Sequence, residues 1–366
     1  MSRILFFSRD YTPHDHRFLS ALAQHGHQVF FLRLERQAYA SEDRPLPPQV
    51  EIVRWVGGER PVSWRDGPRL LASLKRVLRQ VRPDLVQAGP LQRSALLVAM
   101  SGFRPLVSMS WGYDLILDAG RNALWRWATR FTLQRSQALV GDSEIVRRLA
   151  IRYGMPSERV VTFPWGVDLR RFSPPPDREI GAGRPFTLLS TRSWEPIYGV
   201  DVIARAFVLA AARLPGLRLV MLGNGSQAAY LRNIFHQAGV EERIIFAGQV
   251  SQAELPRYYQ AADLYLSASH SDGTSISLLE ALACGCPALV SDIPGNREWI
   301  TPGVVGWLFP DGDYKALAEA ILEAASDRQR LQQMGLAARR LAEERADWEK
   351  NFPRLFDAYA LALRGS

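Results

Sequence analysis

The sequence is poor in cysteine and has no long apolar run. Its two cysteines, Cys284 and Cys286, stand in a C-x-C pair without the further Cys or His residues that a metal site needs, so we expect reduced core residues. No stretch approaches the roughly 18 to 20 apolar residues of a membrane-spanning helix, and the apolar run near the N-terminus is too short for a signal peptide. These absences predict a cytoplasmic protein without transmembrane helices.

Low-complexity tracts are also missing, because Gly and Pro are spread along the chain. The composition is therefore globular, and 366 residues exceed one ordinary core, which predicts two α/β domains. The formal net charge of +8 predicts affinity for something anionic: nucleotide phosphates, an acidic membrane surface or nucleic acid. The sequence contains no helix-turn-helix, zinc finger or aromatic-basic sheet motif, so we expect no nucleic acid partner.

Two basic stretches in the first half have apolar residues at near-helical spacing. They span Arg69–Arg82 and Leu124–Arg135, and the second contains Trp125 and Trp127. Each stretch fits two interpretations: an amphipathic helix that packs on a sheet with its arginines in solvent, or a helix that rests on a membrane surface. The sequence leaves both interpretations open.

Strand-like and helix-like segments alternate along the first half, which is typical of a parallel sheet with helical crossovers. The strand-like segments are RILFFS, QVFFLRL, DLVQAG, PLVSMS, ALVGD and VVTFPWGVD. The run RRFSPPPDREIGAGRP then interrupts the pattern and predicts a linker at 171–185. We therefore expect a first domain at 1–170 and a second at 186–346, with a last helix at about 347–366 that packs back on the first domain.

A second alternation follows the linker and predicts a second doubly wound domain. Its strand-like segments are FTLLS, LRLVMLG, IIFAG, DLYLSAS, ALVSD and GWLF. Ligands of such sheets bind outside the carboxyl ends of the strands, and we expect the residues there to line one crevice that faces the first domain. These residues are Arg192, the turn Gly223-Asn224-Gly225, Gly248 and the loop around Asp272. The turn alone is weak evidence for a phosphate loop, because tight strand-to-helix connections have the same residues.

One acid, Glu280, interrupts an otherwise apolar helix-like segment of the second half. A buried carboxylate without hydrogen-bond partners is costly, so something must satisfy it. A ribose is a suitable partner, because a carboxylate can accept hydrogen bonds from both hydroxyls of a vicinal diol. The alternative is an ordinary buried helix in which Glu280 bonds a neighbouring backbone group.

The polar loop before this helix suits a phosphate. Gly273 lets the backbone approach a ligand, Thr274 and Ser275 are good N-caps, and the free N–H groups up to Ile276 favour an anion at the helix start. A nucleoside diphosphate would engage both ends of this segment, with its phosphates at the loop and its ribose at Glu280.

Several segments, in order, resemble those of glycosyltransferase family four, the retaining GT-B enzymes that use nucleotide-sugar donors. VGDSEIVRRLA resembles the family's SE helix start, FPWGVDLRRFSP its PNGVD segment, and LLSTRSWEPIYGVDVIARAF its segment with an arginine and a KG pair. LGNGS, FAGQV and the block from Asp272 to Pro294 follow at the usual spacings. The resemblance implies an α/β protein of two Rossmann-like domains that face a central cleft, and hexosyl transfer without a metal or other cofactor.

The resemblance also implies roles for single residues. The family's E-x7-E signature appears as Asp272-x7-Glu280, so Asp272 would hold hydroxyls of the donor sugar and Glu280 the ribose. Arg192 matches the arginine that stabilises the leaving diphosphate. Six residues later, where the family usually has lysine, this chain has Tyr198, followed by the expected Gly199. A phenol can donate a hydrogen bond to phosphate, but it brings no charge.

The first domain departs further from the family. Its first strand is followed by the run from Asp10 to His16 instead of a glycine-rich loop, and the family's histidine segment is replaced by Trp111-Gly112-Tyr113-Asp114. We expect His14 and His16 in a loop open to the cleft, bound to donor phosphate or acceptor hydroxyls, or else engaged only in loop packing. Asp114 is expected to orient or deprotonate the acceptor, and Trp111 to stack on a sugar ring or to pack in the core.

The expected activity is retaining transfer of a sugar from a nucleotide-diphosphate sugar to a hydroxyl, in cell-surface polysaccharide or glycolipid synthesis. The basic, Trp-bearing surface of the first domain favours a membrane-bound acceptor, which would place the protein peripherally on the inner face of the membrane. We expect no metal, because Asp311-Gly-Asp313 stands directly before a helix-like segment and suits capping. Two other classes stay open: a non-catalytic nucleotide-sugar binder, suggested by the missing lysine, and a GT-B phosphorylase or epimerase.

Overall fold

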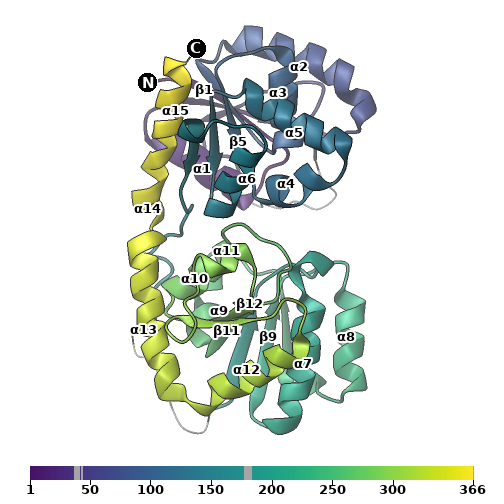
Figure 1. Cartoon of the computed structure of the whole chain (residues 1–366), viewed down its shortest axis with the longest axis vertical. Helices are drawn as coiled ribbons and strands as arrows, with labels where there is room; N and C mark the ends of the chain where they lie inside the picture. Colours follow the sequence, from purple (N-terminus) through teal and green to yellow (C-terminus); the bar gives the residue numbers. More distant parts are fainter. Residues whose placement is uncertain (37–41, 43, 177–183, 366) are drawn as a thin grey trace. The chain divides into compact units, whose positions relative to one another are not determined.

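The chain forms two compact units in the computed structural model, which describes residues 1–36, 42, 44–176 and 184–365 (Figure 1). Unit 1 consists of Met1–Phe163 together with Phe352–Ser366, and unit 2 of Pro164–Asn351. The division after Phe163 precedes the expected domain end at 170, and the centre of the expected linker, 177–183, lies outside the described residues. From Phe352 onward, the last part of the chain belongs to unit 1.

Unit 1 is built on a parallel sheet of seven strands in the order β3-β2-β1-β4-β5-β6-β7. The strands are β1 (Arg3–Ser8), β2 (Gln28–Arg33), β3 (Val50–Ile52), β4 (Leu85–Ala88), β5 (Leu106–Met109), β6 (Ala138–Gly141) and β7 (Val160–Thr162). The strand order runs outward from β1 in one direction and from β4 in the other, so the sheet is doubly wound with its switch point between them. Only β3 was not expected, because three residues are too few to show an alternating pattern.

Helices cover both faces of this sheet, because successive strand residues point to opposite faces. On one face, Leu5 and Phe7 belong to a core cluster with α2 (Gly67–Val81) and α3 (Leu96–Ser101). On the other face, Tyr359 of α15 (Leu355–Arg364) donates a hydrogen bond to Gln87 of β4. The remaining helices of the unit include α4 (Tyr113–Ile116), α5 (Ala123–Arg135) and α6 (Glu144–Arg152).

The first helix, α1 (Pro13–Gln24), starts inside the segment that was expected to be a loop. Thr12 caps it: the Thr12 side chain accepts from the amide of Asp15, and Asp15 Oδ2 accepts from the Thr12 amide at 2.8 Å, which forms a capping box. Pro13 then occupies the first turn, where its missing N–H costs nothing. His14 and His16 therefore lie in the first turn of a helix, and their expected place in a loop is corrected.

Unit 2 repeats the plan with six parallel strands in the order β10-β9-β8-β11-β12-β13. The strands are β8 (Phe186–Ser190), β9 (Leu217–Leu222), β10 (Ile244–Gly248), β11 (Leu264–Ser267), β12 (Ala288–Ser291) and β13 (Gly306–Phe309). All six were expected from the sequence. The switch point lies between β8 and β11.

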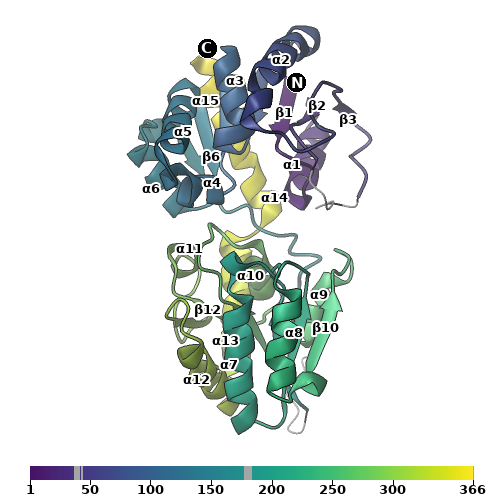
Figure 2. The same cartoon turned by 90° about the vertical axis from the view of Figure 1, so that its right-hand side faces the viewer.

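Two groups of helices enclose this second sheet. One core cluster joins it to α7 (Val200–Arg213), α8 (Ala228–Gln237) and α12 (Tyr314–Ser326), and Figure 2 shows α7 and α8 side by side. Another joins the opposite strand residues to α9 (Leu255–Ala261), α10 (Ile276–Ala283) and α13 (Arg328–Arg345). The short helices α11 (Pro294–Arg297) and α14 (Trp348–Asn351) complete the unit.

Several local expectations hold in unit 2. Both cysteines are buried thiols, and Gly285 between them has a φ of +65°, which suits the residue after a helix end. Asp313 caps α12, since its side chain accepts from the amides of Lys315 and Ala316 at 3.0 Å. Within the described parts of the chain, no helix combines the length and apolar composition that crossing a bilayer requires.

Candidate functional site

Two loops meet at the switch point of unit 2. The strands β8 and β11 are hydrogen-bonded neighbours, and each ends at the same edge of the sheet. Arg192 stands two residues after β8, and Asp272 lies in the loop that follows β11. Doubly wound sheets bind ligands here because the chain turns to opposite faces from the two strands and leaves a space between the loops.

Arg192 is a buried cation held by the opposite loop. Its Nη2 lies 2.8 Å from Oδ2 of Asp272, and its Nη1 donates to Oγ of Ser275 at 3.0 Å and of Ser277 at 3.2 Å. Burial, the largest single effect, lowers the pKa of Arg192, but the charge of Asp272 and the nearby tyrosines together outweigh it, and the pKa is raised. The buried Nε–H has no hydrogen-bond partner among the residues that the structure describes, so one donor is left for a ligand.

Tyr198 covers the guanidinium group. The Cζ of Arg192 lies 4.1 Å from the centre of the Tyr198 ring, well inside the range of a cation–π contact. The next residue fixes this geometry, because Gly199 has a φ of +57° and any Cβ there would stand 2.1 Å from the backbone oxygen of Ala268. Tyr198 is thus held over Arg192 by a turn that only glycine fits.

The N-terminus of α10, next to Arg192, presents backbone amides as hydrogen-bond donors. Oγ of Ser275 caps α10 and accepts from the amide of Leu278 at 3.4 Å, while the first amides of a helix lack partners within it. The preceding loop is fixed by Gly295, since a Cβ there would lie 2.1 Å from the backbone oxygen of Gly273. The expected donor-binding residues Gly273, Thr274, Ser275 and Ile276 therefore lie at one helix N-terminus beside Arg192.

Glu280 lies one turn further along α10 and is only 6% exposed. Its Oε2 accepts a hydrogen bond of 2.8 Å from the hydroxyl of Tyr259, which is itself 3.1 Å from Oγ1 of Thr191. A buried carboxylate requires a hydrogen-bond partner, and Tyr259 on α9 supplies one within the unit. The expected ribose contact of Glu280 stays a prediction, now with one carboxylate oxygen fixed by Tyr259.

Amides of the turn Gly223-Asn224-Gly225 are hydrogen-bonded within unit 2. The Gly223 amide donates to the backbone oxygen of Gly248 at 2.7 Å, and the Gly225 amide to Oδ1 of Asn224 at 2.8 Å. The following amide, of Ser226, donates to Oε1 of Glu195 at 2.8 Å. These bonds satisfy the amides of Gly223, Gly225 and Ser226 within unit 2. The turn connects β9 to α8, and its expected contact with a phosphate stays a prediction.

Asp114 in unit 1 lies in the interior. Its carboxylate is fully buried and accepts from Oγ of Ser110 at 2.6 Å and from the amides of Leu91 and Leu115 at 3.0 Å. Burial raises the pKa of Asp114 to about 6, against the opposing effect of these hydrogen bonds. In this structure Asp114 joins the loops after β4 and β5, so its expected role toward the acceptor stays a prediction that its burial makes less favourable.

The structure brings two of the three expected acceptor-side residues together. The rings of His14 and Trp111 lie 5.7 Å apart, and both side chains are partly exposed. His16 points elsewhere, because its Nδ1 is 2.6 Å from the hydroxyl of Tyr11. Burial, followed by the charge of Arg44, lowers the pKa of His16. A role at the acceptor side remains a prediction for His14 and Trp111 and is less suited to His16.

The buried cap of α1 predicts a pH effect on stability. Burial raises the pKa of Asp15 to about 7, from an ordinary value of 3.8. Between about pH 4 and about pH 7 the folded protein therefore holds a proton that the unfolded chain has lost, and the free energy of unfolding falls as the pH rises. Relative to Asp15→Asn, the melting temperature of the wild type should drop across this range and level off above it. A difference that stays constant or grows with pH would contradict the assignment.

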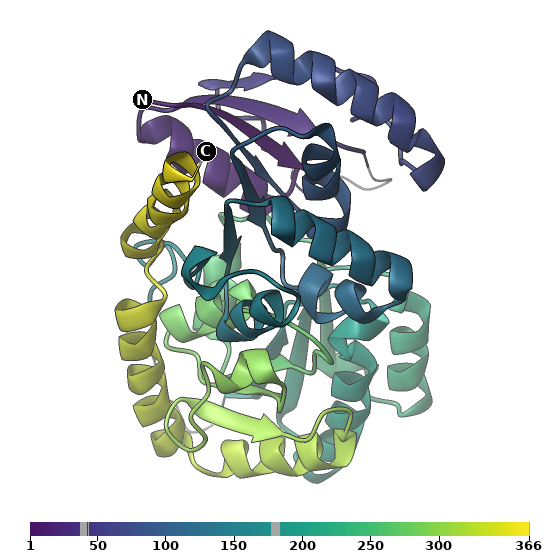
Figure 3. The ribbon, with the colours of Figure 1, turned by 45° about the horizontal axis from the view of Figure 1, so that its top comes forward.

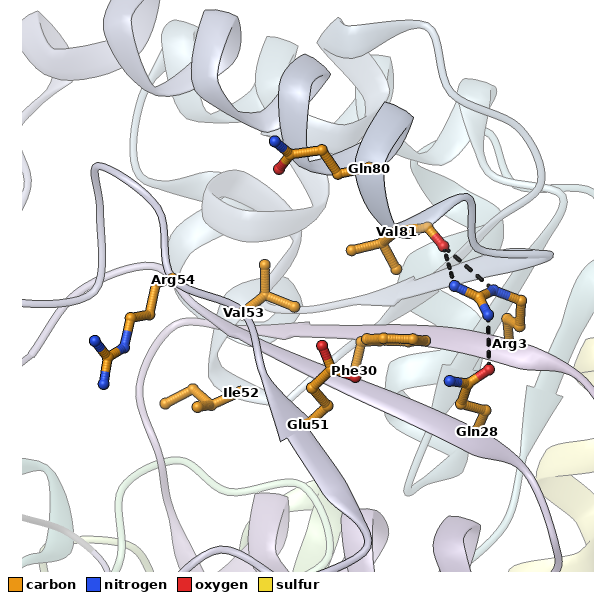
Figure 4. Close-up of a pocket in the computed structure, with 9 residues that line it drawn as sticks. All are labelled: Arg3, Gln28, Phe30, Glu51, Ile52, Val53, Arg54, Gln80 and Val81. Atoms are coloured by element: carbon orange, nitrogen blue, oxygen red, sulfur yellow. Dashed lines mark hydrogen bonds between the residues drawn. The ribbon is translucent and has the colours of Figure 1, made fainter.

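Two hollows within the units lie elsewhere. One, of about 440 Å³, is lined by residues at the starts of β1 and β2 and at the end of α2, with Arg3 bonded to Gln28 and to the backbone of Val81 (Figure 4). The other, of about 620 Å³, lies between Arg213 and α12. Neither contains an expected site residue, and the first is at the amino ends of its strands. Topology and the buried charge at Arg192 therefore point to the switch point of unit 2 rather than to these hollows.

Two family descriptions match adjacent parts of the chain. "Glycosyltransferase Family 4" matches residues 14–171, and "Glycosyl transferases group 1" matches residues 177–341. The chain belongs to glycosyltransferase family 4. It is therefore a glycosyltransferase of the hexosyltransferase class, with the GT-B fold of two Rossmann-like domains and a nucleotide-sugar donor.

Named relatives and solved structures agree with this family. A GDP-mannose-dependent alpha-(1-6)-phosphatidylinositol monomannoside mannosyltransferase of Mycolicibacterium smegmatis is 26% identical over 79% of both chains. A D-inositol 3-phosphate glycosyltransferase of Thermobispora bispora is 30% identical, but over 59% of this chain and 54% of its own length. The fold matches that of Anabaena HepE in complex with UDP (TM-score 0.79, 19% identity, 98% and 99% coverage) and of Thermosynechococcus elongatus sucrose-phosphate synthase (0.81, 18%, all of both chains).

This glycosyltransferase departs from its family at Tyr198, and the departure can be tested. Tyr198→Phe keeps the ring face over Arg192 and should leave kcat within about threefold, whereas Tyr198→Leu removes the cation–π contact and should lower kcat roughly tenfold. Tyr314→Leu is the matched control, because Tyr314 also lies under an arginine, 5.9 Å from Arg205. Steady-state kinetics of the three variants measure the effect. Equal losses for Phe and Leu would assign the role to the hydroxyl.

Sequence reasoning missed three side chains of the glycosyltransferase site. Tyr259 and Thr191 support Glu280, and Ser277 binds Arg192. Ser277 could have been found, because it is the only polar residue between the helix cap and Glu280. Tyr259 could not, since its bond to Glu280 joins two helices that are separated by a strand and a loop.

Proposed function

We propose that this glycosyltransferase moves a sugar from a nucleoside-diphosphate sugar to a hydroxyl with retention of the anomeric configuration and without a metal. The observation that carries the proposal is the buried guanidinium of Arg192, fixed by Asp272, Ser275 and Ser277 at the switch point of unit 2. A fixed positive charge beside a helix N-terminus suits the two phosphates of the leaving group.

The reaction depends on the placement of charge. As the bond between the anomeric carbon and the phosphate oxygen breaks, the diphosphate gains negative charge and the sugar becomes oxocarbenium-like. Arg192 and the first amides of α10 stabilise that charge more in the transition state than in the bound donor. The acceptor oxygen then bonds to the anomeric carbon on the same face, and its proton passes to the departing phosphate oxygen. No carboxylate pair is needed to move that proton.

Two acids divide the recognition of the donor in this proposal. Glu280, whose Oε2 accepts from Tyr259, also accepts from the ribose hydroxyls. Asp272, which is paired to Arg192 and partly exposed, accepts from hydroxyls of the sugar. Because Asp272, which holds the sugar, is paired with Arg192, which holds the leaving phosphate, the two side chains are positioned together.

The proposed acceptor is a saccharide carried on a lipid or on a growing cell-surface polysaccharide. The supporting observations are the mycobacterial relative, whose name gives a phosphatidylinositol mannoside as its acceptor, and the basic helices of unit 1. The protein would then act from the cytoplasmic face of a membrane without a transmembrane helix.

A ligand screen tests the proposal. A ligand that binds only the folded state raises the melting temperature, so UDP, GDP, ADP and their sugars are compared by thermal shift. One nucleoside diphosphate and its sugar should stabilise the protein, and NMR of the product should show the donor's anomeric configuration. Binding without turnover on any donor would favour a non-catalytic binder. Turnover that requires inorganic phosphate or no acceptor would favour a phosphorylase or an epimerase.

A further inference from the structure

The helical layer of unit 1 is rich in cations and poor in acids. The helices α2, α3 and α5 lie side by side on one face of the sheet (Figures 1 and 3). The stretch 67–83 contains Arg69, Lys75, Arg76, Arg79 and Arg82 without an acid, and the stretch 119–141 contains Arg121, Arg126, Arg130 and Arg135 without an acid. Within the described parts of the chain, none of these nine cations takes part in an ion pair.

In unit 2, several arginines form ion pairs with acids. On α13, Arg330 pairs with Glu323 at 3.0 Å and Arg339 with Glu343 at 2.7 Å. On α7, Arg213 pairs with Glu319. The stretches that contain α2 and α5 differ in holding nine cations and no acid, which leaves this face with a positive potential.

Large apolar side chains project from the same layer. Of the ten Trp residues, only Trp64 and Trp127 are more than a third exposed, at 46% and 48%. Trp64 precedes α2 and packs edge-on against Trp125 of α5, which joins the starts of the two helices. Leu124 is 51% exposed and Trp127 stacks on Phe131, so these three residues form one stripe along α5 at spacings of three and four.

The fold does not use this outward face. The inner side of α2 is buried through Leu70, Leu74 and Val77, and that of α5 through Trp125 and Leu133. The sequence left open whether these stretches pack on a sheet or rest on a membrane, and the structure shows that packing takes one side of each helix and leaves the other available. Apolar tips surrounded by unpaired cations need an anionic partner with an apolar interior.

We infer that the outward face of α2, α3 and α5 docks on an anionic lipid bilayer. Arginines bind lipid phosphates, and Trp and Leu enter the boundary between head groups and acyl chains, where an amphipathic ring is stable. A nucleic acid would satisfy the cations but not the Leu124 and Trp127 stripe. This inference builds on the proposed function, because it names the surface that brings the enzyme to a lipid-linked acceptor.

Vesicle sedimentation of the full chain tests the inference. Vesicles of equal parts phosphatidylglycerol and phosphatidylcholine should bind the wild type at low salt, high salt should release it, and pure phosphatidylcholine should bind far less. Arg126→Gln with Arg130→Gln should weaken binding roughly twentyfold, because each arginine near an anionic surface contributes about fivefold. Trp127→Ala should weaken it without changing the salt dependence.

Matched variants in unit 2 serve as controls. Arg218→Gln with Arg340→Gln removes the same charge from exposed positions, and Leu336→Ser removes an exposed apolar side chain. These variants should bind like the wild type. The inference is overturned if the wild type does not bind anionic vesicles, if control and α5 variants lose equal affinity, or if duplex DNA or RNA binds with the same dependence on Trp127. Thermal shift with the donor nucleotide, which should be unchanged in every variant, separates failed docking from a failed glycosyltransferase assignment.

Discussion

Replacing Arg192 by alanine is expected to lower kcat about a hundred- to a thousandfold, the loss seen when one fixed donor to a developing charge is removed. The side chain is buried, is paired to Asp272 at 2.8 Å and makes a cation–π contact with Tyr198, so its position is fixed before the donor binds. Arg192→Lys should fall between alanine and the wild type, because an ammonium keeps the charge but cannot bond Asp272, Ser275 and Ser277 together. Single-turnover rates at saturating donor measure the loss.

Two measurements distinguish a loss of catalysis from a folding defect. The melting temperature of Arg192→Ala shows whether the unpaired Asp272 has destabilised unit 2. Arg205→Ala removes an exposed arginine of α7, bonded to Tyr230 at 2.6 Å, and should leave kcat unchanged. A folded Arg192→Ala enzyme with kcat within threefold of the wild type would remove Arg192 from the reaction.

Glu280→Ala is expected to weaken binding of the nucleoside diphosphate about ten- to a hundredfold, since hydrogen bonds to a charged group are stronger than neutral ones. The test uses the ribose itself. Wild type should bind a 3′-deoxy analogue more weakly than the natural nucleotide, and Glu280→Ala should bind both equally, which isolates the pairwise interaction. Isothermal titration of the four combinations gives the coupling.

Tyr259→Phe separates the ligand contact from the internal one. It removes the hydroxyl that donates to Glu280 but keeps the carboxylate, so nucleotide binding should change much less than in Glu280→Ala. If Glu280→Ala still distinguished the 3′-deoxy analogue as the wild type does, Glu280 would be a structural acid that Tyr259 satisfies.

Sequence patterns predicted the strands well because most of them run through a buried core. All six strands of unit 2 were found, and only β3 of unit 1 was missed, since a three-residue edge strand with two exposed residues leaves almost no pattern. Helix starts were less accurate. The capping box of Thr12 and Asp15 lay in a segment that was read for its histidines, and α1 was therefore begun too late.

The site was predictable where chemistry follows chain order and unpredictable where it depends on burial. Arg192 and Asp272 follow neighbouring strands, so topology alone brings their loops together. Asp114 looked available from its place after β5, but three donors from two loops enclose it. The Gly turn looked open, but Glu195, from the loop after β8, accepts from the amide of Ser226 directly after it. Neither contact leaves a mark in the local sequence.

The division of unit 1 between the two ends of the chain affects how the protein is made. Residues from Phe352 onward supply Leu355, Ala358 and Tyr359 to its interior, and Tyr359 bonds Gln87, 272 positions earlier. A ribosome releases the N-terminal part first, so that part must wait for the whole of unit 2 to be synthesised before its core can close. Unit 2 is continuous and can fold during this interval. An expressed fragment that stops at Asn351 would leave an exposed apolar surface and should aggregate.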